Sequence, residues 1–143
     1  MPLDPDLLHE QLRRALIRFV GSTVPRQRSP AVLHLGTPGS AHLTFEQQPA
    51  YDSGLWADVI ERALDGLDLD RSTPVPWVTR TGELSPGDHD FGWFAAVREG
   101  FGRHGLDLPG FFVMNQHGWF DLTTDTEPTL CRVRRRKRRA LSA

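Results

Sequence analysis

Residues 75–115, VPWVTRTGELSPGDHDFGWFAAVREGFGRHGLDLPGFFVMN, decide the fold. The stretches 76–79 and 110–115 are short and rich in aromatic and β-branched residues, which predicts strands. Between them, apolar residues recur at helical spacing over 89–104 and stop at Gly105, which predicts a helix. A strand–helix–strand unit of this kind places its two strands side by side and parallel, with a right-handed crossover.

Working outward, the flanking segments predict two more helices and up to four more strands. A second strand–helix–strand unit over 41–79 predicts another parallel neighbour, whereas the hairpins predict antiparallel strands. The expected order is α-β-β-α-β-α-β-β-(β): one α/β or α+β domain, with a mixed five- or six-stranded sheet flanked by helices. The added elements are helices at 5–20 (capped by Asp4 and Gly21) and 53–65 (capped by Asp52 and Gly66), and strands at 31–35, 41–46, 119–123 and 129–134. For the helix at 89–104, Ser85 or Asp88 is the expected start.

Length and composition favour one globular domain without covalent staples. The chain has 143 residues, 38% of them hydrophobic and 24% charged, which is the range of folded proteins and not of disordered ones. Its one cysteine, Cys131, excludes a disulfide within the chain and a cysteine-rich zinc site. The apolar runs are too short to span a membrane, and the first residues lack the pattern of a signal peptide. We therefore expect a cytoplasmic protein.

Charge is distributed unevenly along the chain. Residues 1–131 hold all 18 acidic residues and 10 arginines, a net charge of −8. Residues 132–139 carry a charge of +7, and Lys137 among them is the only lysine. The lack of other lysines argues against a Walker-type phosphate loop, a Schiff-base enzyme and a lysine-dependent nuclease. The expected division is a globular body over 1–134 and a flexible basic tail over 135–143.

A basic run of this density is able to bind nucleic acid or another polyanion. The same charge also suits an anionic membrane surface, an acidic protein partner or the acidic body itself. In the structural alternative, its first part is a charged edge strand, which discourages strand addition. The residues of this run are Arg132, Arg134, Arg135, Arg136, Lys137, Arg138 and Arg139.

Two histidines in the first hairpin form a weak candidate metal site. If Leu35 pairs with Ala41, His34 lies directly opposite His42, close enough for both rings to share a metal ion. The alternative is that both are ordinary polar residues on the solvent side of the hairpin. A metal site needs further ligands, for which His89, Asp88 and Asp90 are only guesses, and we expect no cofactor.

The carboxyl ends of the two central strands predict a crevice, because ligands of parallel sheets tend to bind there. A guanidinium, imidazoles and carboxylates in one crevice suffice for acid–base chemistry. The competing interpretation is structural, since acidic residues favour a helix N-terminus and His117-Gly118 suits a turn. The residues expected around this crevice are Arg80, Thr81, Asp88, His89, Asn115 and His117.

Two functions of different classes follow from these features. The favoured one is a non-enzymatic binding or accessory module with an acidic body and a basic tail that contacts nucleic acid or another polyanion. The alternative is a small hydrolase-like enzyme that uses Arg80, Asp88, His89 and His117. We lean against an enzyme, because no nucleophile motif, metal triad or phosphate loop is evident. A protein partner and a homo-oligomer both stay open.

Overall fold

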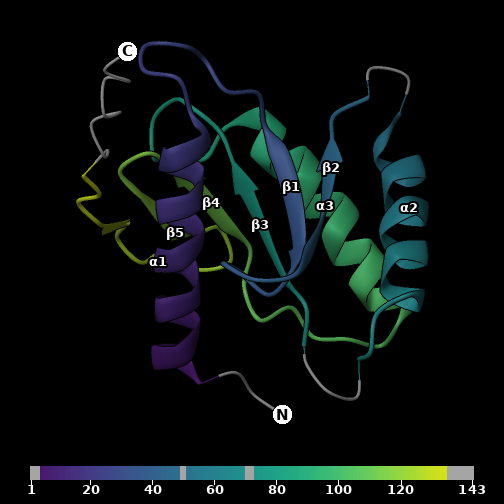
Figure 1. Cartoon of the computed structure of the whole chain (residues 1–143). Helices are drawn as coiled ribbons and strands as arrows, with labels where there is room; N and C mark the ends of the chain where they lie inside the picture. The colour runs from purple at the N-terminus through teal and green to yellow at the C-terminus, as the bar shows by residue number, and fades with distance from the viewer. Residues whose placement is uncertain (1–3, 49–50, 70–72, 135–143) are drawn as a thin grey trace, which may run out of the picture.

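The structure is a computed structural model that describes residues 4–48, 51–69 and 73–134 (Figure 1). Within these ranges three helices accompany one six-stranded sheet. The predicted fold class is thereby confirmed. In chain order the elements are α1 (Pro5–Ser22), β1 (Val32–Gly36), β2 (His42–Glu46), α2 (Ser53–Asp65), β3 (Val75–Thr79), α3 (Asp88–Arg103), β4 (Phe112–Asn115), β5 (Gly118–Asp121) and β6 (Thr129–Leu130).

The strands lie in the order β2-β1-β3-β4-β5-β6. The unit predicted from 75–115 is confirmed, because β3 and β4 are parallel neighbours joined through α3. The second predicted parallel pair is wrong, because β1 lies between β2 and β3 and is antiparallel to both. Burial accounts for this order: Leu33 and Leu35 of β1 are fully buried, whereas most of β2 is exposed or half-buried. The more apolar strand takes the interior position, and the more polar one forms the edge.

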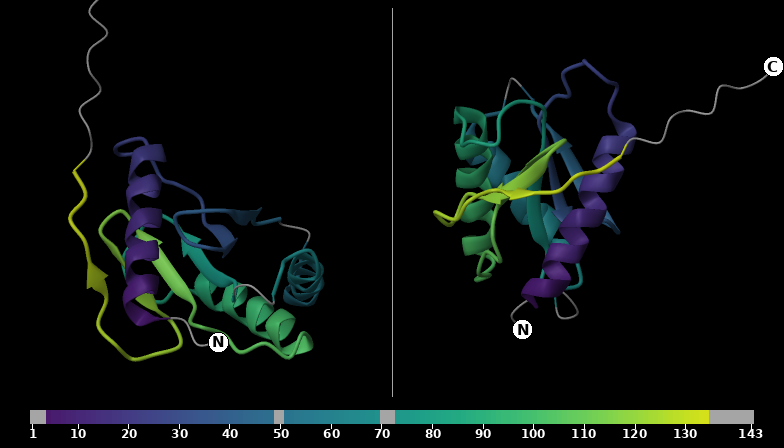
Figure 2. Two further views of the ribbon diagram at one scale, coloured as in Figure 1. Left: turned by 60° about the horizontal axis from the view of Figure 1, so that its bottom comes forward. Right: turned by 90° about the vertical axis from the view of Figure 1, so that its left-hand side faces the viewer.

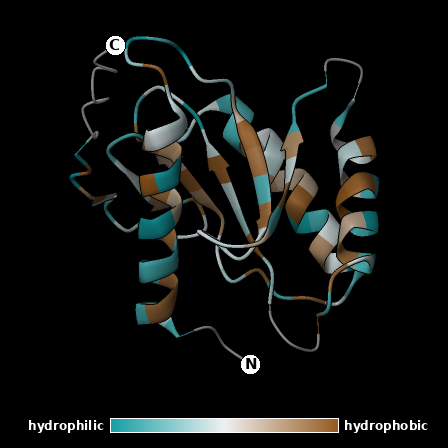
Figure 3. Cartoon of the chain, in the orientation of Figure 1, coloured by the Kyte–Doolittle hydropathy of each residue, from teal (hydrophilic) through white to brown (hydrophobic). Residues whose placement is uncertain are grey.

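Helices cover both faces of the sheet, with α1 on one side and α2 and α3 on the other (Figure 2). The core on the α1 side includes Trp77 of β3 and Met114 of β4. The core on the other side includes the adjacent residues of the same strands, Val78 after Trp77 and Val113 before Met114. Alternation therefore buries both faces of the central strands, which explains their nearly continuous apolar sequence. Hydrophobic and hydrophilic bands alternate along α1 and α2, as in helices with one face against a core (Figure 3).

The helix starts follow the predicted capping residues in two cases out of three. At the other end of α1 the predicted cap Gly21 is wrong, because the helix continues to Ser22 and Thr23 is its cap. Asp4 and Asp52 accept backbone N–H bonds at the starts of α1 and α2, as predicted. The third helix begins differently: Gly87 occupies the cap position, and its N–H donates to the Asp90 carboxylate at 2.9 Å. Of the two expected starts, Asp88 is the first residue of α3 and Ser85 lies outside the helix. The cap itself is Gly87, because Asp90 in the first turn reaches back to its N–H.

Two glycines allow backbone approaches that fix the layers. Gly39, in the turn between β1 and β2, has φ +74°, and a Cβ there would lie 2.5 Å from Cβ of Arg14. The hairpin turn is thus packed directly against α1. Gly100 of α3 meets α2, where an added Cβ would lie 2.7 Å from Cγ2 of Ile60. Both positions require a residue without a side chain.

The end of the described chain continues along α1 after the short strand β6. Cys131 and Val133 pack against the α1-side core, whereas Arg132 and Arg134 are exposed. The predicted last strand over 129–134 is thus confirmed only at Thr129–Leu130, although the inward–outward alternation continues to Arg134. The rest of the basic tail, 135–143, lies outside the described residues. None of the helices in the described ranges is long and apolar enough to cross a membrane.

Candidate functional site

The guanidinium of Arg80, expected in the crevice, is instead occupied by hydrogen bonds within the chain. Its Nε and one Nη2 hydrogen donate to the two carboxylate oxygens of Asp90, at 3.0 and 2.8 Å. The other three hydrogens donate to backbone carbonyls of the β3–α3 loop: Nη1 to Thr81 and Glu83, and Nη2 to Ser85. All five N–H donors of the side chain are therefore used.

Burial makes this pair a structural brace. The side chain of Asp90 is 1% exposed and that of Arg80 is 14% exposed. A buried carboxylate is costly without a partner, and the bidentate geometry supplies one with two charge-assisted bonds. Asp90 had been only a weak metal-ligand candidate in the sequence. It connects the end of β3 to the first turn of α3, and this leaves Arg80 no spare donor for a ligand.

The remaining crevice residues are divided between two hollows. Asp88 and His89 are exposed and share the first hollow with Arg80. Asn115 and His117 line another, on the far side of the β3–α3 loop. Asn115 is itself engaged, because its amide donates to the Gly82 carbonyl at 2.8 Å and its oxygen accepts the His117 backbone N–H at 2.8 Å. The six predicted residues do not form one site.

Thr81, the last of the six residues expected around the crevice, is hydrogen-bonded to the loop that follows α1. Its hydroxyl accepts from the backbone N–H of Ser29 at 3.1 Å, and its backbone N–H donates to the Ser29 carbonyl. The loop between α1 and β1 is consequently held at the carboxyl end of β3. This contact brings a loop with two arginines, Arg26 and Arg28, to the same end of the molecule as His117.

The two hairpin histidines meet, although in a different register from the one predicted. His34 is opposite Thr44, and His42 is opposite Gly36, so the histidines are diagonal neighbours on one face. The turn takes up Thr37 to Ala41, closed by a bond from the Thr37 N–H to the Ala41 carbonyl, and this shifts the pairing. Their ring centroids are 4.9 Å apart.

Each ring has one hydrogen-bond partner and aromatic neighbours, whereas Nδ1 of His34 is buried without a partner. His34 stacks on Trp77 at 4.9 Å, and its Nε2 is 2.8 Å from the Thr79 hydroxyl. Burial, and to a smaller extent the nearby His42, lowers the pKa of His34 to about 4. His42 places Nδ1 2.7 Å from the Ser40 carbonyl. Across 4–48, 51–69 and 73–134, no cluster of three or more His, Cys, Asp or Glu side chains is placed to hold a metal ion.

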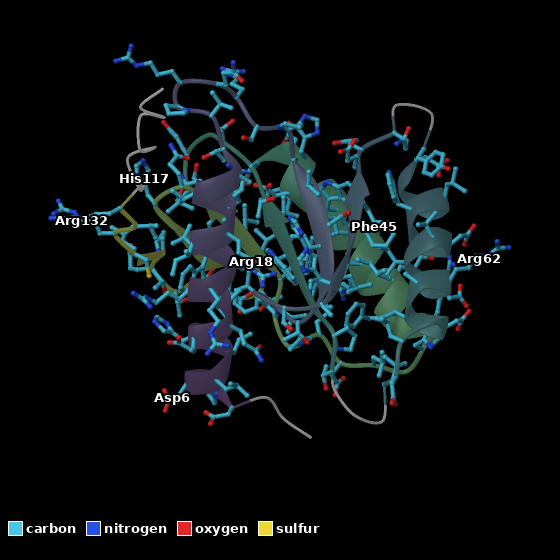
Figure 4. The ribbon with its side chains drawn as sticks, in the orientation of Figure 1. Asp6, Arg18, Phe45, Arg62, His117 and Arg132 are labelled. Carbon is cyan, nitrogen blue, oxygen red and sulfur yellow. The ribbon has the colours of Figure 1, made fainter. Side chains whose placement is uncertain are left out.

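A shallow groove of about 360 Å³ lies beside these rings, between α1 and the part of the sheet that α1 leaves open. It is lined by Arg18 and Phe19 of α1 together with His34 and Trp77. The Arg18 side chain lies between the helix and the sheet in Figure 4. No carboxylate is found among the described residues that line it.

A second hollow without carboxylates lies where the basic run leaves the body. This hollow, which we call the root groove, has a volume of about 640 Å³ and is bounded by residues 23–27, 116–117 and 131–133. Arg26, His117 and Arg132 are its basic and imidazole side chains, and the described lining contains no Asp or Glu. His117 and Arg132 lie on the same side of the molecule, opposite Arg62 of α2 (Figure 4).

The sequence contains a signal for this surface that the search for motifs missed. Residues 11–45 include five arginines and no acidic residue, whereas 46–131 include fifteen acidic residues and five arginines. The acid-free stretch covers most of α1, the loop after it, β1 and nearly all of β2. A search of the sequence for long stretches without Asp or Glu would have identified the stretch 11–45.

Comparison of the chain with protein-family models, with curated proteins and with solved structures finds no match. The functional argument therefore depends on the charge and geometry described above.

Proposed function

We propose that this protein is a non-enzymatic binding module that contacts nucleic acid through its basic C-terminal run. The observation that carries the proposal is the opposition between a +7 segment at 132–139 and a −8 body at 1–131. Arg132 and Arg134, the two members of the run that lie in the described residues, are exposed. Their neighbours Cys131 and Val133 pack inward and hold this part of the run against the body.

The expected binding is electrostatic and independent of base sequence. Each phosphate neutralised by a guanidinium or ammonium group releases condensed counterions, so affinity falls steeply as salt is added. Seven such contacts correspond to a loss of about 10⁴-fold between 50 and 200 mM salt on a duplex. Sequence-specific readout is not part of the proposal, because the run has no aromatic residues that could stack on bases.

The hydrolase-like alternative lacks comparable support. Its guanidinium, Arg80, donates all its hydrogens to Asp90 and to loop carbonyls. His117 lies in a different hollow from Asp88 and His89. A cytoplasmic location belongs to the proposal, because it brings the module to nucleic acid and suits the unpaired thiol of Cys131.

The test compares the full chain with a full-length variant in which all seven basic residues of 132–139 become glutamine. Fluorescence anisotropy with a labelled 20-base-pair duplex and a labelled 20-nucleotide RNA would be measured at 50 and 200 mM salt. We expect the wild type to bind both at low salt and the variant to lose most of that affinity. Equal affinity of the two proteins would refute the proposal. Stronger binding to poly-glutamate than to either nucleic acid would identify an acidic protein as the partner of the run, and would also refute the proposal.

A further inference from the structure

We infer that the root groove is a second phosphate-binding site, which takes the sugar–phosphate backbone of a nucleic acid whose neighbouring phosphates contact the basic run. This inference deepens the proposed function and rests on it. The groove is formed by the loop after α1, the β4–β5 turn and residues 131–133, which are far apart in the sequence. Two of these three walls carry an arginine, Arg26 and Arg132.

The positive charge in the groove is not neutralised by the protein. Among the described residues, neither Arg26 nor Arg132 makes an ion pair with a carboxylate. Arg103, at the end of α3, provides the contrast, because Asp58, Glu61 and Glu99 all pair with it. Guanidinium groups without carboxylate partners, in a hollow without carboxylates, are suited to phosphate.

The groove is continuous with the run and with the acid-free stretch 11–45. Arg132 is both the first basic residue of the run and a wall of the groove. The loop that carries Arg26 follows α1 directly, and α1 contributes Arg13, Arg14 and Arg18 to the exposed surface. A strand of phosphates held by the run can thus enter the groove without passing a cluster of carboxylates.

The backbone at Arg26 is held in a conformation that is unusual for its residue type. Arg26 has φ +65°, and in the described ranges no other non-glycine residue has a positive φ. The turn is closed by a bond from the Gln27 N–H to the Val24 carbonyl at 3.2 Å. A glycine would adopt this conformation at lower cost, so the turn places an arginine where the backbone alone favours glycine.

Shape favours a nucleic acid over a membrane as the occupant. Val24, which lines the groove, and Leu130, which precedes its third wall in the chain, are exposed and, with the basic run, resemble the edge of a membrane-binding surface. A bilayer surface, however, presents its headgroups on a plane, and a plane cannot fill a hollow of about 640 Å³. A flexible phosphodiester chain can follow it.

The experiment uses full-length protein, labelled dT12 and rU12, and vesicles that contain phosphatidylserine, each titrated over a series of salt concentrations. Arg26→Gln is compared with Arg62→Gln, which removes an equally exposed arginine from α2 on the opposite side. Arg26→Gly is a second variant, because it removes the charge and relieves the positive φ, and therefore does not lower stability through strain.

We expect both Arg26 variants to reduce the slope of log affinity against log salt by about 0.7 on the single strands, and Arg62→Gln to leave it unchanged. The loss should persist in a chain whose six basic residues over 134–139 are glutamine, because Arg132 is retained there. Binding of dT12 and rU12 to equal extents would assign the contact to the phosphates, and a preference for rU12 would add a contact to the 2′-hydroxyl; both support the inference.

Three outcomes separate this inference from the proposed function. If neutralising 132–139 abolishes binding but the Arg26 variants match the wild type, the groove inference is wrong and the proposed function stands. If the Arg26 variants lose affinity while neutralising 134–139, which keeps Arg132, has no effect, the groove is supported and the proposed role of the run is wrong. If the Arg26 variants change only vesicle binding, the occupant is a membrane and the inference is overturned.

Discussion

Replacing Arg80 by methionine tests whether the bidentate pair with Asp90 is a structural brace. Methionine keeps much of the length and apolar character of the side chain but removes every donor. The Asp90 carboxylate, 1% exposed, would then keep only the 2.9 Å bond from the Gly87 N–H. The three loop carbonyls that Arg80 also serves lie at exposed or half-exposed positions, where water can replace it.

The expected cost is therefore dominated by the carboxylate. Breaking a buried ion pair by removing one partner typically costs about 3–5 kcal/mol, because the other charge stays buried without compensation. A protein of this size loses about 1–3 kcal/mol of stability per molar urea. The urea midpoint of Arg80→Met should thus fall by at least about 1 M relative to the wild type.

Arg103→Met is the matched control, monitored by the same urea titration with tryptophan fluorescence. Arg103 has three carboxylate partners and Arg80 only one among the described residues, but the Arg103 side chain is 32% exposed and its partners are 40–61% exposed. Exposed pairs contribute little, because water screens them and their side chains lose freedom when they pair. The midpoint of Arg103→Met should stay near the wild-type value. A larger loss for Arg103→Met than for Arg80→Met would refute the argument from burial.

Two further substitutions test the α1 side of the sheet. Gly39→Ala should lower the free energy of unfolding by about 1–3 kcal/mol, because φ is +74° there and the new Cβ would meet α1. The control Gly92→Ala, in open space on α3, should raise the free energy of unfolding by about 0.5–1 kcal/mol. Similar urea midpoints of the two variants would contradict this prediction. Burial, and to a smaller extent His42, lowers the pKa of His34 to about 4 in the folded chain, from about 6.5 in the unfolded chain. Between pH 6.5 and 4 the unfolded state therefore binds more protons, and stability falls as pH is lowered. Between pH 7 and pH 5, protonation of His34 in the unfolded state should lower the free energy of unfolding of the wild type by about 2 kcal/mol. The His34→Gln variant should not show this decrease. Equal decreases in both proteins would show that His34 is not the cause.

Local patterns in the sequence determined the elements well. The apolar spacing over 53–65 and the flanking Asp52 and Gly66 predicted α2 with the observed bounds. The unit 75–115 predicted the parallel pair β3–β4 correctly. Such features depend on neighbouring residues and on short connections, so a sequence contains them directly.

The strand order and the register of the first hairpin could not be predicted in the same way. The place of β1 between β2 and β3 depends on which strand gains more from burial on both faces, a comparison between strands that no local pattern expresses. The pairing of His34 with Thr44 depends on a turn one residue displaced from the predicted one.

The candidate site failed for a related reason. Arg80 and Asp90 are ten residues apart across an irregular loop, and only the folded path of that loop brings them together. Each residue type was compatible with a ligand site, so the sequence could not exclude one. The root groove was not predicted: the lack of acidic residues over 11–45 concerns only one of its walls, and the three walls meet only in three dimensions.

The contacts between Thr81 and Ser29 have a consequence for how the molecule approaches a charged partner. They hold the arginine-bearing loop at the end of the sheet where the basic run begins, while most carboxylates lie on α2, α3 and the later loops. The charge is therefore distributed unevenly along the chain despite a net charge of −1. In the field of a polyanion such a molecule is oriented before contact, which increases the fraction of productive collisions at low ionic strength. The same asymmetry favours association between oppositely charged parts of two copies, so the solubility of the protein should increase when salt is added.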